Sequence, residues 1–148
     1  MAITLTDFMK TAAFRRLRYQ RSWYLVRPVD SKELGIQALF VKQGISRTDL
    51  GRRLRSYRTY WPSGVQVIAA AAIRQPEQGE GADAEAISVV ERAVLARVKR
   101  VRPGVESLWL NQVDAAISAV RHHPLVFFVW EADRSGDLLC GLKDNHTN

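Results

Sequence analysis

The sequence predicts an α/β fold of the α+β type, in which helices flank a small, mixed and largely antiparallel central sheet. Apolar runs typical of strands alternate along the chain with segments of helical periodicity. The chain has 148 residues, which suffices for one ordinary domain. Hydrophobic residues make up 47% of it and charged residues 25%, a balance that favours a packed core over disorder.

Three parts of the chain differ in character. We expect an N-terminal helical arm, a single domain and a polar tail, at residues 1–21, 22–142 and 143–148. The arm is predicted to contain one helix, because an apolar face follows Thr6, a suitable N-cap. That face consists of Met9, Ala13 and Leu17.

Inside the domain, the first two strands are predicted to pair as an antiparallel hairpin. The apolar runs 23–26 and 38–45 predict the strands, and turn-forming residues between them predict an elaborated loop. A helix is expected to begin at Ser46 or Thr48 and to end before Pro62.

The second half continues the alternation. The run 65–73 is almost entirely aliphatic, as in a strand buried on both faces. A surface loop is expected at 75–81, followed by the longest helical pattern, 84–101, which ends before Pro103 and Gly104. The other expected elements are a strand at 108–110, a helix opened by a capping box at Asn111 and Asp114 that runs to about His122, and strands at 125–130 and 138–142 around a turn at Ser135 and Gly136.

The net charge of +7 is concentrated in the first half of the chain. Residues 1–74 hold 14 of the 22 Lys and Arg but only 4 of the 15 Asp and Glu. Guanidinium groups bind phosphate in a bidentate manner, so the pattern favours DNA or RNA as a partner. A solvated surface and an acidic protein partner are the alternatives. The predicted nucleic-acid-binding residues are Arg47, Arg52, Arg55, Arg58, Lys99, Arg100 and Arg102.

Other patterns bear on the cellular setting. No run approaches the ~18 apolar residues that cross a bilayer, so no membrane span is predicted. Asp7 and Lys10 interrupt the first apolar stretch, which argues against a signal peptide. The single cysteine, Cys140, excludes an intramolecular disulfide and a cysteine-built zinc site. We therefore expect an intracellular, reducing compartment.

Four side chains of suitable chemistry are predicted to lie at inner edges of these elements. Arg53 borders the apolar stripe of its helix, where its five donors need an anion. Glu91 lies beside the apolar stripe of the longest helix, where an unpaired carboxylate is costly to bury. Tyr24 and Lys42 belong to the paired strands and can share one face.

A phenol, an ammonium, a guanidinium and a carboxylate together suit phosphodiester hydrolysis. Cations offset the charge that develops on phosphorus, and a carboxylate helped by waters and a substrate phosphate can hold Mg²⁺. The structural alternative is simple charge pairing. In that case Arg53 pairs with an internal carboxylate, and Glu91 pairs with Arg53 or Arg92.

Five short motifs follow one another between Ser22 and Arg121. They are Trp23-Tyr24-Leu25, Val41-Lys42-Gln43-Gly44-Ile45-Ser46, Arg53-Leu54, Glu91-x-x-x-Leu95 and Lys99-Arg100-x-Arg102-Pro-Gly104-x-Glu106-x-x-Trp109. In this order they resemble the GIY-YIG endonuclease superfamily, most closely its viral and phage branch, where the second motif often reads Lys-Ile-Gly. The resemblance implies a GIY-YIG-like fold for residues 22–142 and phosphodiester cleavage with Mg²⁺ or Mn²⁺.

The resemblance also implies roles for individual residues. Tyr24 would activate or orient the attacking water, Arg53 would stabilise charge in the transition state, and Glu91 would hold a single metal ion. Tyr57 stands one turn after Arg53, where the family often has a histidine or another polar residue. Core packing is the alternative role for Tyr57.

Two positions depart from the family pattern. Lys42 replaces the tyrosine of the second motif, and Ser22 replaces the glycine of the first. A lysine can still hold a phosphate, yet a fold freed from catalysis would tolerate the same change. Three hypotheses therefore remain. The first is a metal-dependent endonuclease that binds DNA or RNA. The second is a catalytically inactive GIY-YIG-like protein that contacts other chains in a larger assembly, for example as a minor component of a virus particle. The third is a nucleic-acid-binding accessory domain without chemistry.

Overall fold

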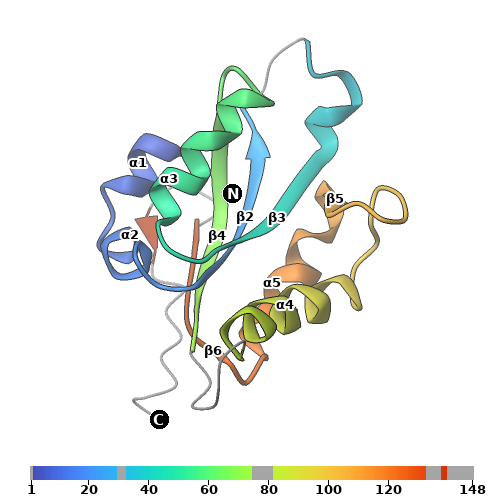
Figure 1. Cartoon of the computed structure of the whole chain (residues 1–148). Coiled ribbons are helices and arrows are strands. Elements are labelled where there is room, and N and C mark those ends of the chain that lie inside the picture. Colours follow the sequence, from blue (N-terminus) through green and yellow to red (C-terminus); the bar gives the residue numbers. More distant parts are fainter. Residues whose placement is uncertain (1, 30–32, 75–81, 133–137, 140–148) are drawn as a thin grey trace.

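Helices cover both faces of a largely antiparallel sheet in the computed structural model (Figure 1). The structure describes residues 2–29, 33–74, 82–132 and 138–139, with the backbone alone at 82–87 and 138–139. Four predicted features lie outside the described residues. They are the loop at 75–81, the turn at Ser135 and Gly136, Cys140 and the polar tail at 143–148.

The sheet follows the strand order β5-β3-β2-β4-β6-β7, and β1 pairs with β4 beside this path. Its strands are β1 (Ile3–Thr4), β2 (Ser22–Pro28), β3 (Phe40–Ser46), β4 (Val65–Ile73), β5 (Ser107–Trp109), β6 (Val126–Ala132) and β7 (Leu138–Leu139). Every strand pair within the described residues is antiparallel, which confirms the prediction of a largely antiparallel sheet. The sequence did not predict β1, which spans only two residues.

The helices form two layers, one on each face of the sheet. They are α1 (Leu5–Met9), α2 (Ala12–Leu17), α3 (Leu50–Arg55), α4 (Ala82–Leu95) and α5 (Val113–Arg121), with 3-10 turns at Gly35–Leu39, Ser56–Thr59 and Leu110–Gln112. Buried side chains of α1, α2 and α3 pack on one face, and those of α4 and α5 pack on the other (Figure 1). We call these the aromatic face and the aliphatic face, after the residues that distinguish the two cores.

The N-terminal segment contains two short helices where one was predicted. Thr4, not Thr6, is the N-cap of α1. The hydroxyl of Thr11 donates to the carbonyl of Phe8 (2.7 Å) and accepts from the amide of Phe14 (2.9 Å). This side chain therefore ends α1 and begins α2. Phe8 and Phe14 are buried, so the predicted arm contributes to the core of the aromatic face.

The central strands lie close to their predicted ranges. β2 and β3 pair as the expected antiparallel hairpin. Every residue of β4 except Gln66 is buried, which confirms a strand covered on both faces. Neither Ser46 nor Thr48 caps α3, because β3 extends through Ser46 and α3 begins only at Leu50. Asp49 is the cap, and its carboxylate accepts from the amide of Arg52 at 3.2 Å.

Two boundaries in the second half were predicted wrongly, and tertiary hydrogen bonds explain both. Helix α4 ends at Leu95 because the later residues pair with the β5 region: the amide of Val101 donates to the carbonyl of Ser107 at 2.9 Å. The capping box expected at Asn111 and Asp114 does not form. The N-cap of α5 is Gln112, whose amide oxygen instead accepts from the backbone N–H of Lys99 at 3.0 Å.

Candidate active site

Two phenols and a guanidinium meet on the aromatic face of the sheet. Tyr24 projects from β2, Arg53 from α3 and Tyr57 from the 3-10 turn that follows α3. The two phenol oxygens lie 2.7 Å apart, and Nε of Arg53 donates to the Tyr24 oxygen at 3.1 Å. Tyr24 has no exposed surface and Tyr57 is 4% exposed. The phenols therefore form a buried hydrogen-bonded pair that holds the base of the guanidinium.

Gly44 makes room for this arrangement. It lies opposite Tyr24 in the β2–β3 register, and the tyrosine ring crosses over it. A Cβ at position 44 would lie 2.9 Å from Cε1 of Tyr24 and would collide with the hydroxyl end of the ring. The glycine of the second motif is thus required by a close approach between neighbouring strands.

Tyr57 connects the phenol pair to an aromatic neighbour and two cations. Its ring lies edge-on to that of Tyr24 and stacks on Trp61, with centroids 5.6 Å apart. The Nζ atom of Lys42 lies 5.8 Å from the Tyr57 ring centroid, and the guanidinium carbon of Arg53 lies 5.9 Å from it. Burial and the neighbouring Tyr24 raise the pKa of Tyr57, so its phenol stays protonated.

Arg53 is exposed at its guanidinium end although its Nε is held inside. The hydrogen bond to Tyr24 raises the pKa of Arg53, which keeps the group charged. The expected alternative was a carboxylate partner. Within the described residues Arg53 forms no ion pair with Glu91; its hydrogen-bond partner is the phenol.

Glu91 lies on α4, on the other side of the sheet, and is half-buried. Its backbone carbonyl accepts from Nε2 of Gln43 (3.4 Å), and Oε1 of Gln43 accepts from the indole N–H of Trp23 (2.7 Å). Because Trp23 and Gln43 belong to β2 and β3, these two hydrogen bonds fix α4 against the sheet at Glu91.

The Glu91 carboxylate lies among several other charges. Burial raises its pKa, and the nearby carboxylate of Glu106 raises it further. The cations of Arg100 and Lys42 act in the opposite direction. The ammonium group of Lys42 lies close to the Tyr57 ring, and its charge also acts on Glu91. Glu91 forms no ion pair with Arg92 in the part of the chain that the structure describes.

Glu106 was not among the predicted site residues. It immediately precedes β5, whose Ser107 pairs with Lys42 of β3. Its charge acts on Arg53, on Tyr57 and on Glu91, and so links the two parts of the site. The only signal in the sequence was its place in the last motif of the resemblance.

A basic hollow of about 560 Å³ lies beside Arg53. Its lining includes Arg47, Arg52 and Arg53 together with Ile45, Ser46, Thr48, Asp49 and Ser56. Asp49, the one carboxylate in this lining, is already engaged, because it caps α3 and lies 3.5 Å from Nε of Arg18. Burial works against ionisation of Asp49, but the Arg52 amide and the Arg18 charge outweigh it and lower its pKa.

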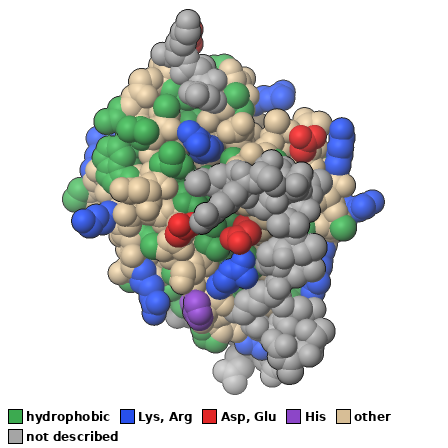
Figure 2. All heavy atoms as spheres, turned by 180° about the vertical axis from the view of Figure 1, so that it is seen from behind, with side chains coloured by type: hydrophobic (Ala, Val, Ile, Leu, Met, Phe, Trp, Pro, Cys, Tyr) green, Lys and Arg blue, Asp and Glu red, His purple; other side chains and the backbone are tan. Residues whose placement is uncertain are grey.

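The remaining predicted nucleic-acid-binding residues are spread over two regions. Arg55 and Arg58 are exposed on α3 and the turn after it. Lys99, Arg100 and Arg102 are exposed after the end of α4. On the face drawn in Figure 2, basic side chains are scattered, some at the rim and some in the middle, and do not gather in one patch. Charge alone therefore does not mark a path for nucleic acid on that face.

Neither a cluster of potential metal ligands nor a membrane-spanning helix occurs among the described residues. No group of three or more His, Cys, Asp or Glu side chains is placed to hold a metal ion there. Among these residues there is also no helix with the length and apolar character needed to span a membrane.

Comparison of the chain with protein-family models, with curated proteins and with solved structures gave no match. The resemblance to the GIY-YIG superfamily therefore rests on the sequence motifs alone.

Proposed function

We propose that this chain is a GIY-YIG-like nucleic-acid-binding domain that hydrolyses phosphodiester bonds with one divalent cation. The main support is the convergence of Tyr24, Tyr57 and Arg53 beside Lys42 and next to a basic hollow. A charged guanidinium fixed by buried phenols at the rim of such a hollow is suited to a phosphate group.

The two glutamates suit a hard cation. Burial and the charge of Glu106 both disfavour ionised Glu91, and a divalent cation between the two carboxylates would relieve that cost. Mg²⁺ is commonly held by one or two carboxylates plus substrate phosphate, so a third protein carboxylate is not needed. Glu91 and Glu106 would hold the ion, which as a Lewis acid withdraws electron density from the scissile phosphate.

The other residues then have separate tasks. Arg53 and Lys42 bind the phosphate and offset the negative charge that grows on phosphorus as water attacks and the P–O bond breaks. Tyr24 acts as a positioning residue in this proposal, because its full burial keeps it from the attacking water. Tyr57 holds Tyr24 and, with its raised pKa, does not serve as a base.

A second candidate is the catalytically inactive protein that contacts other chains. An apolar hollow of about 440 Å³ is lined by Leu39, Trp109, Leu110 and Asn111, and Leu39 is 52% exposed. Such a surface suits another polypeptide better than a phosphate backbone. Lys42 in place of the motif tyrosine favours the same hypothesis.

Nicking of supercoiled plasmid in Mg²⁺ or Mn²⁺ tests the proposal. We expect wild-type protein to nick the plasmid, and Arg53→Gln and Glu91→Gln each to reduce the rate by about 10²- to 10³-fold. Arg92→Gln is the matched control, since it removes one exposed charge from α4 next to Glu91. Equal activity of all four proteins would indicate a contaminating nuclease, and an inactive wild type would favour the second candidate.

A further inference from the structure

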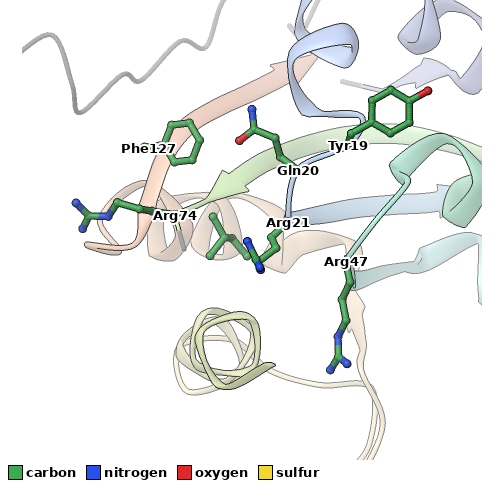
Figure 3. A pocket seen from close by; sticks show the side chains of 7 residues that line it. Tyr19, Gln20, Arg21, Arg47, Arg74 and Phe127 are labelled. Carbon is green, nitrogen blue, oxygen red and sulfur yellow. The ribbon is translucent and has the colours of Figure 1, made fainter. Parts of the chain in front are cut away.

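A second basic hollow, of about 530 Å³, lies at the end of the sheet where β2 begins, β4 ends and β6 begins. Three arginines line it, Arg21, Arg47 and Arg74, together with two aromatic side chains, Tyr19 and Phe127 (Figure 3). None of its lining residues is acidic. The hollow therefore combines positive charge with aromatic surface.

Arg47 lines both hollows. The two hollows are therefore neighbours on either side of Arg47, and a ligand lying across Arg47 would reach from one to the other. The charges along this path are Arg53, Arg52, Arg47, Arg21 and Arg74.

The directions of the arginines indicate an extended ligand. Figure 3 shows the side chains of Arg21, Arg47 and Arg74 pointing different ways instead of converging on one point. A single phosphate ion would need convergent donors, whereas successive phosphates of a chain can each meet a separate guanidinium. One of these groups is held in place, because the Arg74 guanidinium donates to the carbonyl of Pro124 at 2.9 Å.

The aromatic side chains indicate unpaired bases. Tyr19 is 69% exposed, and the guanidinium of Arg18 lies 4.9 Å from its ring centroid. Bases of a duplex stack on one another and offer no free face inside the helix, whereas bases of a single strand can stack on an exposed ring. An exposed tyrosine beside a row of arginines therefore favours a single strand.

From these observations we propose that the second hollow binds a single-stranded nucleic acid segment continuous with the phosphate at Arg53, with Tyr19 stacking on a base. This proposal deepens the proposed function, because it assigns the substrate class as nucleic acid with a single-stranded arm. It also predicts binding without cleavage when no divalent cation is present.

Fluorescence anisotropy in EDTA tests the proposal with the full chain and a labelled 20-nucleotide oligo(dT). Tyr19→Ser is expected to weaken binding about 5- to 100-fold, as stacking on one base predicts. Tyr60→Ser is the matched control, because Tyr60 is 75% exposed elsewhere on the surface, and we expect a change below about 2-fold for it. Thermal unfolding of both variants checks that each is folded.

Two further probes separate stacking from charge. An abasic strand of the same length should bind wild type about as weakly as oligo(dT) binds Tyr19→Ser. Arg47→Gln should weaken oligo(dT) binding and lower the slope of log K against log[salt] by about 0.7. Equal effects of Tyr19→Ser and Tyr60→Ser, or equal affinity for the abasic strand, would overturn the proposal. Plasmid nicking separates this proposal from the proposed function. If oligo(dT) binding depends on Tyr19 but the plasmid is not nicked, only the proposed hydrolysis is rejected. If the plasmid is nicked but binding does not depend on Tyr19, only the binding role of the second hollow is rejected.

Discussion

The two faces of the sheet differ in chemistry although they share the same strands. On the aliphatic face, Trp23 is surrounded by valine, isoleucine, leucine and alanine, and the core closes against α4 and α5. On the aromatic face, six of the sixteen buried core residues are phenylalanine, tyrosine or tryptophan, and they include Tyr24 and Tyr57. Each face nonetheless contains a buried hydrogen bond between two side chains, Trp23–Gln43 on the first and Tyr24–Tyr57 on the second.

This difference indicates how the candidate site is built. The aromatic face places a guanidinium through buried hydroxyls, and the aliphatic face places a carboxylate through the backbone of α4. Lys42 of β3 lies near Tyr57, and its charge also acts on Glu91. The sheet thus separates the groups proposed to bind phosphate from the group proposed to hold the cation.

The largest effect is expected from Gly44→Ala, on the aromatic face. The added Cβ would collide with the Tyr24 ring, so we expect a loss of about 3 kcal/mol in the free energy of unfolding, measured with urea. Gly104→Ala is the control, because Gly104 has φ +81° and nothing within 4 Å of an added Cβ, so only backbone strain of about 1 kcal/mol applies. Equal costs at the two glycines would contradict the close approach of the ring.

Tyr24→Phe should cost about 2 kcal/mol, because it leaves the buried Tyr57 hydroxyl without its partner and releases Arg53. Tyr57→Phe should cost less, since Arg53 still donates to Tyr24. In a double-mutant cycle the two effects should fall short of additivity. Strictly additive costs would mean that the phenols do not interact.

Gln43→Met tests the corresponding connection on the aliphatic face. It removes the acceptor of the buried Trp23 indole, and we expect a cost of about 1.5 kcal/mol in urea unfolding. Gln37→Met removes the same kind of bond, to the indole of Trp61, at an exposed position. Its cost should stay below about 0.5 kcal/mol. If the Gln43 variant is as stable as the Gln37 variant, the role of Gln43 in anchoring α4 to the sheet is contradicted.

The smallest expected effects concern the pH dependence of stability. Ionisation of a carboxylate should destabilise the fold on the aliphatic face and stabilise it on the aromatic face. The pKa of Glu91 is raised by folding, so its ionisation destabilises the fold, and Glu91→Gln should stabilise it by under about 1 kcal/mol at pH 7. That gain should vanish as the pH falls below 4.5, the ordinary pKa of a glutamate. Thermal unfolding across pH 3 to 8 measures the difference.

On the aromatic face the opposite sign is expected for Asp49. Its pKa is lowered, so the ionised form stabilises the fold above the ordinary value of 3.8, and this contribution is lost as the pH falls through the lowered pKa. Asp49→Asn keeps a capping side chain and should be less stable than wild type at pH 7, with the difference closing in acid. The same sign for both variants would refute the assigned charge environments.

The sequence was informative where local patterns decide structure. The sequence pattern predicted β2, β3 and β4, most clearly β4, because a strand between two covered faces needs an almost unbroken apolar segment. It failed where pairing across a turn decides. The helical pattern continues to Val101, yet Arg100 and Val101 pair with Leu108 and Ser107 beyond the turn that contains Gly104.

The same distinction applies to the site. Helix spacing predicted that Arg53 lies toward the sheet. The two strand patterns predicted that Tyr24 and Lys42 belong to paired strands. Nothing local indicates that Tyr24 and Tyr57 share a hydrogen bond, which requires the register of β2 against α3. Glu106 was missed for a similar reason, since an exposed carboxylate before a three-residue strand is unremarkable until the strand is docked against β3.

The central claim is that Arg53 and Glu91, on opposite faces of the sheet, serve one reaction. Single-turnover cleavage of a labelled oligonucleotide in Mn²⁺ by Arg53→Gln, Glu91→Gln and the double variant tests it most directly. We predict that each single variant is about 10²- to 10³-fold slower than wild type and that the double variant is no slower than the slower single. Effects that multiply fully in the double variant, or a wild-type protein that leaves the substrate intact, would contradict a shared site.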